Sequence, residues 1–271
     1  MRYTQPQGGP LRLDPANPLS IGLFASIEGT QNPWDAVAQT QWTTGSTAPP
    51  NAVTSRGVAR NTTGGLYDLR RRVDGPLSTL LPWTFATTLC STANVSLSHV
   101  FGFGIQYNGA TIDIGATFYG QYRALLNYSN NYYFWGSSAD WNTGIAWDTD
   151  GLIHTVMFVS DGASLYFYRD GVRRATTTLP SGLVTTVSGA YAVLGNKHQS
   201  GANSPSASIL SGRAWSRALS ASDAKAYAGN EFQLFASPRR ILKASALYPT
   251  LSNSRFNPAT SSGGYPAIDL S

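Results

Sequence analysis

Two residue types are nearly missing from this 271-residue chain, cysteine and glutamate. Cys90 is the only cysteine, so the sequence excludes an intramolecular disulfide and any metal site built from several cysteines. It lies in the run TFATTLCS, which is typical of a β-strand, and we expect its thiol to be a small buried side chain. Glutamate occurs only at Glu28 and Glu231, far apart in the chain. Few carboxylates are therefore left for acid–base chemistry.

Charged residues and long apolar segments are also scarce. Asp, Glu, Lys and Arg make up 12% of the chain, about half the usual share for a soluble domain. No apolar run approaches the roughly 20 residues of a membrane span, and the N-terminal MRYTQPQGGPLRL lacks the apolar core of a secretory signal. We therefore expect a protein that is made in a cytoplasm and has no membrane partner.

The net charge of +5 comes mostly from arginine. Its clusters at Arg70–Arg72, Arg173–Arg174 and Arg239–Arg240 are scattered over the chain, without interleaved aromatic residues for base stacking. Such clusters are typical of solvated or interface positions, and we expect no nucleic-acid partner.

The segment Ile153–Thr178 contains the clearest structural signal. Its two Asp-Gly dipeptides, Asp161-Gly162 and Asp170-Gly171, are each flanked by runs of Val, Phe, Tyr, Thr and Leu. Such a pair predicts a β-hairpin, because a type I′ turn needs two residues that tolerate positive φ. The segment therefore predicts a three-stranded antiparallel meander. Both faces carry apolar residues, as in a sheet covered on each side. Val156 and Phe158 alternate with Thr155, Met157 and Val159, and Leu165 and Phe167 alternate with Tyr166 and Tyr168.

Short β-branched or aromatic runs, separated by Gly, Asn or Ser, recur along the chain and favour a sandwich or barrel. We expect strands within Val53–Arg60, Gly65–Leu69, Trp83–Ser91, Val95–Gln106, Thr111–Tyr119, Arg123–Tyr128, Ala190–Gly195 and Ala207–Trp215. A single helix is predicted near Ser220–Phe235, because Ser220 can cap it and Asp223 follows as the acidic partner of a capping box.

Proline and glycine concentrate at the two ends of the chain, which predicts extended arms there. We therefore divide the chain into an N-terminal arm (1–18), one β-sandwich domain (19–236) and a C-terminal tail (237–271). Such arms gain order when they lie on a partner.

The meander resembles the laminin-G-like, concanavalin A-like domain, whose usual pattern is W-H-x-V-A-x-x-x-D-G-x-x-x-x-Y-x-D-G. Ile153 stands in place of the usual Trp. The residues that fill the pattern are His154, Val156, Asp161, Gly162, Tyr168, Asp170 and Gly171. Downstream, AVLG resembles the next strand. The run SASILSGRAWSRALSASDAKAYA resembles the closing segment, through Gly212, Trp215, Arg217, Ala218, Leu219 and Ser220.

Two terminal segments resemble tailed-phage virion proteins that carry such domains. NPLSIGLFASIEG is similar to their h-P-L-A-r-G-L opening, and EFQLFASPRRI is similar to their N-P-W-x-L-F-x-P-R-R-I tail. The resemblance covers residues 17–242 and implies an all-β fold: a concanavalin A-like jelly-roll β-sandwich with one short C-terminal helix and extended terminal arms.

The resemblance also implies a non-enzymatic bacteriophage virion structural protein, either a head decoration or a tail- or fibre-associated protein, assembled in the host cytoplasm. We expect the arms to bind other virion proteins or neighbouring subunits of a homo-oligomer. The alternative is a carbohydrate-binding host-receptor module that takes a host surface glycan. A glycan-cleaving enzyme is a third interpretation.

The carboxylates argue against the enzyme. Glucanases of this fold carry E-x-D-x-x-E on one strand, and neither Glu28 nor Glu231 lies in that pattern. Asp148 and Asp150 lie between Trp147 and Gly151, a context typical of a turn. The chain has no G-x-S-x-G motif, and we expect His154 to be a packed or hydrogen-bonded strand histidine. No catalytic residue is predicted.

Aromatic residues cluster in Tyr132–Trp147, interleaved with Asn, Ser and Asp that favour exposed turns. One short strand cannot bury so many rings on one face. We therefore expect at least one of Trp135 and Trp141 to lie partly exposed at the rim, with Tyr133, as a contact for a carbohydrate or partner. Burial in the core is the alternative use of these rings.

The same part of the chain offers oxygen ligands. The resemblance to laminin-G and pentraxin domains implies Ca²⁺, which loop carboxylates and amides would bind; no other cofactor is expected. The candidate ligands are Asp140, Asn142, Asp148 and Asp150. Ordinary turn formation by Asp and Asn is the alternative.

Overall fold

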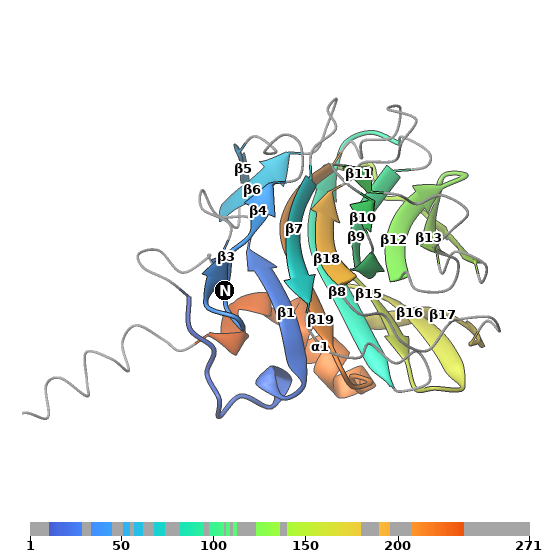
Figure 1. Cartoon of the computed structure of the whole chain (residues 1–271). Helices are drawn as coiled ribbons and strands as arrows, with labels where there is room; N and C mark the ends of the chain where they lie inside the picture. The colour runs from blue at the N-terminus through green and yellow to red at the C-terminus, as the bar shows by residue number, and fades with distance from the viewer. Residues whose placement is uncertain are drawn as a thin grey trace, which may run out of the picture. The chain divides into compact units, whose positions relative to one another are not determined.

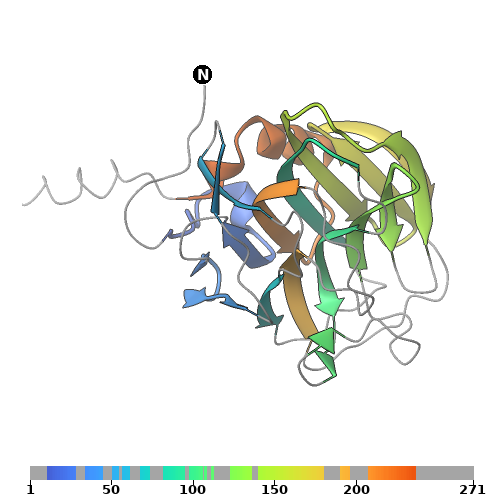
Figure 2. The ribbon, with the colours of Figure 1, turned by 90° about the horizontal axis from the view of Figure 1, so that it is seen from above.

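The computed structural model shows two antiparallel β-sheets packed face to face (Figures 1 and 2). It describes residues 11–28, 34–44, 51–54, 57–61, 68–73, 82–94, 98–105, 107–108, 111–112, 123–135, 140–179, 190–195 and 207–235. These residues belong to Met1–Ala236, the first of two compact units. The predicted C-terminal tail, which forms the second unit, and residues 1–10 of the N-terminal arm lie outside the described residues.

The larger sheet has eight strands, and β1 (Leu23–Glu28) joins it by pairing with β19. The other seven, in spatial order, are β17 (Val172–Thr178), β16 (Ser164–Arg169), β15 (Ile153–Ser160), β8 (Trp83–Ser91), β19 (Ala207–Trp215), β6 (Gly57–Asn61) and β5 (Asn51–Thr54). The segment predicted as one strand over Val53–Arg60 is therefore a hairpin, in which Thr54 pairs with Gly57.

The smaller sheet has seven strands. In spatial order they are β14 (Trp141–Ala146), β13 (Asn131–Trp135), β12 (Arg123–Tyr128), β9 (Ser98–Ile105), β18 (Ala190–Gly195), β7 (Asp68–Val73) and β4 (Thr43–Thr44). Two short hairpins add β2 (Trp34–Asp35) with β3 (Thr40–Gln41), and β10 (Tyr107–Asn108) with β11 (Thr111–Ile112).

The predicted meander is confirmed as β15, β16 and β17, which are neighbours in the larger sheet. Its two faces take part in different clusters. The inner face supplies Val156, Phe158, Leu165 and Phe167 to the core between the sheets. The outer face supplies Met157, Val159, Tyr166 and Tyr168 to a second apolar cluster. Alternation along each strand thus places a hydrophobic layer on both sides of this sheet.

The two Asp-Gly turns differ. Asp170 and Gly171 have φ of 52° and 74°, so the second turn has the two left-handed residues of a type I′ hairpin. In the first turn, Gly162 has positive φ and Asp161 does not. The carboxylate of Asp161 instead accepts the N–H groups of Ala163 and Ser164, at 2.9 and 2.7 Å. The prediction of a type I′ turn at Asp161 was therefore wrong, because the aspartate side chain closes a longer loop.

A helical layer covers the outer face of the larger sheet. Helix α1 (Ala221–Gly229) begins with the predicted capping box, in which Ser220 and Asp223 bond each other's backbone N–H. Tyr227 packs edge-on to Trp215, with ring centroids 5.4 Å apart. The helix ends before the predicted Phe235, because Asn230 is extended and its side chain caps a separate 3-10 helix, η2 (Glu231–Leu234).

The described part of the N-terminal arm lies on this layer. Leu13 forms a β-bridge with Phe235, and the N–H of Asp14 donates to the carbonyl of Leu234 at 2.7 Å. The chain then enters a short 3-10 helix, η1 (Pro18–Ser20), whose first turn is capped by Asn17. Within the described residues, no helix has the length and apolar character needed to cross a membrane.

Candidate functional site

The aromatic segment predicted to contact a partner forms the hairpin β13–β14 at the end of the smaller sheet. β14 also contacts β17, the end strand of the larger sheet. Both end strands therefore lie on the same side of the sandwich.

The rings of this hairpin divide between the core and the surface. Tyr132 and Phe134 are fully buried between the sheets. Trp141 pairs with Phe134, and its half-buried ring meets Phe158 edge-on at a centroid distance of 5.9 Å. Tyr133 is half-buried and alternates with the two core residues, so it points to the outer face. Trp135 ends β13, and its side chain lies outside the described part of the structure.

Asparagine amides lie beside the outward-facing tyrosine. Asn142 stands opposite Tyr133 in the register of β13 and β14. Its Oδ1 accepts the side-chain amide of Asn131 at 3.1 Å and the N–H of Gly144 at 2.9 Å. Asn142, which the sequence suggested as a calcium ligand, therefore uses its carbonyl oxygen within the hairpin. Asp140 is exposed immediately before β14.

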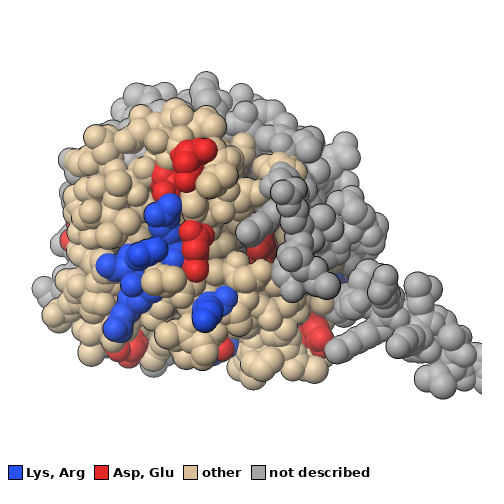
Figure 3. All heavy atoms as spheres, turned by 180° about the vertical axis from the view of Figure 1, so that it is seen from behind, with Lys and Arg blue, Asp and Glu red and all other residues tan. Residues whose placement is uncertain are grey.

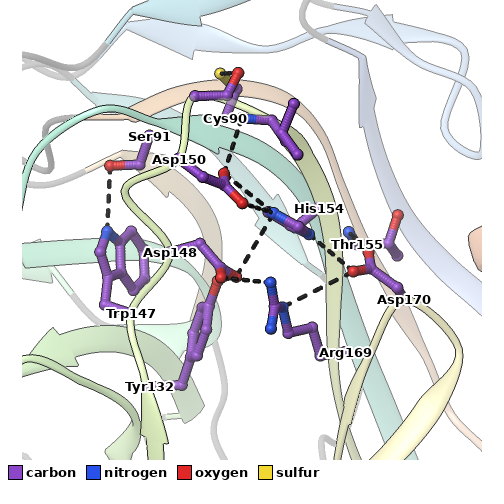
Figure 4. A network of polar contacts seen from close by, with 12 residues as sticks. Cys90, Ser91, Tyr132, Trp147, Asp148, Asp150, His154, Thr155, Arg169 and Asp170 are labelled. Carbon is purple, nitrogen blue, oxygen red and sulfur yellow. Dashed lines mark hydrogen bonds and ion pairs between the residues drawn. The ribbon is translucent and has the colours of Figure 1, made fainter.

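Asp148 and Asp150 lie in the loop between β14 and β15, together with His154 at the start of β15 (Figure 4). One ligand atom from each of the three residues lies within 4.8 Å of the others, so the group could hold a metal ion. Asp140 is not part of this group, and the Oδ1 of Asn142 is bonded within the hairpin, so two of the four ligands suggested by the sequence lie in the group.

His154 is buried and held between carboxylates, as expected for a hydrogen-bonded strand histidine. Its Nδ1 lies 2.8 Å from Asp170, and its Nε2 lies 3.1 Å from Asp150. Burial by itself lowers the pKa of His154, but the hydrogen bonds of Asp170 and Asp150 and the negative charges of Asp170 and Asp148 outweigh it and raise the pKa above its usual value. Both ring nitrogens then act as donors, which joins the β16–β17 turn to the β14–β15 loop.

Asp148 forms an ion pair and a hydrogen bond with its neighbours. Its carboxylate contacts Arg169 at 2.5 Å and accepts the hydroxyl of Tyr132 at 2.5 Å. Burial and the adjacent Asp148 raise the pKa of Tyr132, so its phenol stays protonated and donates. A cation at this group would lie beside the guanidinium of Arg169 and would compete with the proton on His154. The residues therefore fit an ion-pair network better than a Ca²⁺ site, which prefers six to eight oxygen ligands.

This network predicts a pH dependence of stability. Because the folded pKa of His154 is raised above the unfolded value, its contribution is complete below the unfolded pKa, about 6.5. The contribution is lost as pH rises through the folded pKa. We expect the Tm of the protein to fall as pH rises above about 6.5, and the Tm of His154→Gln to fall less over the same range. Calorimetry of both proteins provides the measurement, and equal slopes would contradict this role.

Cys90 differs from the sequence prediction. Its side chain is half-buried, and Sγ lies 3.1 Å from the carbonyl oxygen of Gly151, next to the loop that carries Asp150. Burial and the charge of Asp150 raise the pKa of this thiol. Cys90 therefore reaches the loop at the edge of the sheet instead of filling the core, and it stays a weakly reactive thiol.

Both glutamates lie around a buried arginine that the sequence analysis did not single out. Arg213 of β19 is fully buried, and its guanidinium bonds Glu28 of β1 and, at 2.6 Å, the hydroxyl of Tyr227 in α1. Glu231 of η2 is also buried and adds attraction for Arg213. The sequence signal for this site was a single charged residue in the strand ASILSGRAW. A buried cation needs a carboxylate partner, so this arginine indicated an acidic residue beside it.

Comparison with known proteins identifies the family of the central segment. Residues 91–225 match the concanavalin A-like lectin/glucanases superfamily. This segment runs from the last residue of β8 into α1. No curated protein sequence matches the chain.

Three solved structures with similar folds illustrate the range of proteins that use it. Domain 4 of an extracellular GH43 arabinanase from Geobacillus stearothermophilus, in complex with arabinotriose, has a TM-score of 0.58 and 17% identity, over 76% of this chain and 98% of that chain. The binding domain of Paraclostridial Mosquitocidal Protein 1 has a TM-score of 0.58 and 10% identity, over 79% of this chain and 53% of that chain. A Trypanosoma rangeli sialidase has a TM-score of 0.54 and 13% identity, over 84% of this chain and 37% of that chain.

The chain thus spans nearly all of the arabinanase domain, about half of the mosquitocidal binding domain and just over a third of the sialidase. At these identities the likeness concerns the fold alone. The fold is the concanavalin A-like sandwich, which serves both binding modules and glycosidases.

Proposed function

Since residues 91–225 carry a domain of the concanavalin A-like lectin/glucanases superfamily, we propose that this protein is a non-enzymatic, glycan-binding structural protein of a tailed-phage virion. The lectin-like fold and the arabinotriose complex of a similar domain support glycan binding. Two segments support the virion role, because they resemble the opening and closing segments of tailed-phage virion proteins: NPLSIGLFASIEG and EFQLFASPRRI.

The observation that carries the glycan proposal is the partly buried ring of Trp141 at the end strand of the smaller sheet. One edge of the ring rests on Phe158, which holds the indole in place. Sugar sites combine such a fixed aromatic surface with nearby amides that hydrogen-bond hydroxyl groups. Asn131 and Asn142 provide amides on the outer face of the same hairpin, beside Tyr133, whereas Trp141 alternates with Asn142 along β14.

The carboxylates support a binding role without hydrolysis. A glycosidase needs two carboxyl groups that flank one glycosidic bond. Glu28 of β1 and Glu231 of η2 are 0% and 1% exposed, out of reach of a polysaccharide. Asp148 is held by Arg169 and Tyr132, so its charge is already used inside the network.

Replacing Trp141 tests the glycan proposal. Trp141→Ala is expected to weaken binding on a glycan array by about tenfold or more, because a stacked ring contributes about 1–3 kcal/mol. Trp141→Phe keeps an aromatic contact with Phe158 and should lose less. The control is Ile21→Ala, which also truncates a large apolar side chain, at a position 64% exposed. Unchanged binding by a folded Trp141→Ala protein would contradict the proposal.

The virion role is tested by locating the protein in purified phage particles with specific antibodies and mass spectrometry. A regular array on the shell would identify a head decoration, and a few copies at the distal tail would identify a receptor-binding component. Absence of the chain from purified particles would overturn the virion role and leave the glycan proposal standing.

A further inference from the structure

Three cationic side chains lie exposed where the edge strand β17 meets α1. Arg173 and Arg174 are exposed near the start of β17, and Lys225 is exposed in α1. The helix and the strand are in contact, since the Cα of Lys225 lies only 2.7 Å from the position that a Cβ on Gly171 would take. Figure 3 shows Lys and Arg side chains gathered in one area of this face, with acidic side chains beside them.

These cations differ from Arg169, Arg213 and Arg217 in their ion pairing. Among the residues that the structure describes, Arg173, Arg174 and Lys225 take part in no ion pair. By contrast, ion pairs join Arg169 to Asp148, Arg213 to Glu28, and Arg217 to Asp223. Neighbouring like charges repel one another, and an anionic ligand would relieve this repulsion.

The surface around the cations is ordered and rich in hydroxyl groups. The guanidinium carbon of Arg173 lies 5.5 Å from the ring centroid of Tyr166, which holds the arginine in place before any ligand arrives. The Tyr166 hydroxyl is itself fixed by a 2.7 Å bond to Asp161. Thr176 pairs with Tyr166, so its exposed hydroxyl lies on the same face of the sheet.

We propose that this basic surface, made of Tyr166, Arg173, Arg174, Thr176 and Lys225, binds the carboxylate or phosphate groups of an acidic polysaccharide. Arginine forms bidentate bonds with either group, and the hydroxyls suit the sugar ring beside it. The inference rests on the proposed glycan-binding function and assigns a ligand class to it. β14 contacts β17, so Trp141 and the basic surface lie on neighbouring end strands of the two sheets.

The charges around the basic surface favour a polysaccharide over a nucleic acid. Asp161 lies at one side of Tyr166, and Asp170 lies in the turn that precedes β17. These carboxylates would repel a strand that carries one phosphate about every 3.4 Å. A polysaccharide with separated anionic groups can place them on the cations and leave neutral hydroxyls beside the aspartates.

The test compares charged and neutral polysaccharides. Binding of the full chain to alginate, to a phosphorylated mannan, and to carboxyl-reduced alginate is measured by biolayer interferometry at 50 and 300 mM NaCl. We expect binding to at least one charged polymer, weakened by salt, and weaker binding to the reduced polymer. Arg173→Gln/Arg174→Gln should reduce binding to the charged polymer about tenfold or more, and Lys225→Gln should reduce it to a smaller extent.

Arg12→Gln is the matched control, because Arg12 is an exposed arginine of the N-terminal segment and belongs to neither β17 nor α1. It should bind as the unaltered protein does, and equal Tm values should show that all variants are folded. Three results would each overturn the inference: binding to neither charged polymer, equal binding to charged and reduced polymers, or equal losses for Arg12→Gln and the double variant.

Equally strong, salt-sensitive binding to a 30-base-pair DNA would also overturn it, in favour of general polyanion binding. If the inference alone fails, neutral glycans on an array still bind and still depend on Trp141. If the proposed glycan function fails, no glycan binds and Trp141→Ala has no effect on the array.

Discussion

Arg213→Met is expected to destabilise the folded protein by about 3–5 kcal/mol, because breaking a buried ion pair leaves its partner charge without compensation. Arg213 is fully buried between the larger sheet and α1, where it bonds Glu28 and Tyr227 and lies over the ring of Phe235 at 5.4 Å. Without the guanidinium, Glu28 would lose the buried cation that it bonds, and Glu231 would lose its attraction to that cation. Urea unfolding at constant pH measures the loss.

The loss should depend on pH in a defined direction. Burial raises the pKa of Glu28 to about 7, against the lowering influence of Arg213. In Arg213→Met that lowering influence disappears, so Glu28 must take up a proton to remain buried. Because a raised folded pKa contributes stability that is lost as pH rises, the variant should be least stable at alkaline pH and partly recover toward pH 5.

A second substitution distinguishes this role from simple loss of packing. Glu28→Gln removes the uncompensated charge, so Glu28→Gln/Arg213→Met should be more stable than Arg213→Met alone, and its stability should vary less with pH. Arg12→Met makes the same chemical change at an exposed arginine and should shift stability by less than about 0.5 kcal/mol. A fully stable Arg213→Met protein would show that the contacts of Arg213 with Glu28 and Tyr227 do not stabilise the packing of α1.

Gly212→Ala is expected to destabilise the protein by about 1–3 kcal/mol, because it adds a methyl group where the two sheets touch. A Cβ at Gly212 of β19 would lie 2.6 Å from the ring carbon Cδ2 of Phe101, which is fully buried on β9 of the opposite sheet. Core side chains are close-packed, so the ring must shift or the sheets must separate.

Gly229→Ala is the matched control for this change. Gly229 ends α1, and a Cβ there would meet nothing within 4 Å. The same methyl group should leave stability unchanged or raise it by up to about 1 kcal/mol through helix propensity. Gly212→Ala/Phe101→Leu should lose less than the sum of the single changes if the clash with the ring is the cause. Equal stability of Gly212→Ala and Gly229→Ala would contradict this explanation.

Local sequence patterns were sufficient for the elements whose signals lie within a few residues. Asp170-Gly171 predicted its turn because both residues adopt positive φ there, and Ser220 with Asp223 predicted the start of α1 because a capping box needs only four residues. The alternation in Ile153–Ser160 predicted apolar layers on both faces of β15. The end of α1 was not predicted, because Asn230 leaves the helix to cap η2.

The candidate site was predicted less completely, because its members come from separate strands and loops. The sequence drew attention to Tyr132–Trp147, but pairing of β13 with β14 decided that Tyr132 and Phe134 are buried while Trp141 is only partly buried. Likewise, Asp148 and Asp150 were candidate ligands, and only the fold brings Arg169 and His154 against them.

The sequence by itself therefore determined the fold class, the central meander and the capping of the helix, because hydrophobic alternation and turn chemistry act between near neighbours. Only the tertiary structure decided the partners of Glu28, a buried pair that joins residues 185 positions apart. It also decided which cations of β17 and α1 form no ion pair with the residues that the structure describes. Charge pairing and exposure depend on which distant segments meet, and no local pattern contains that information.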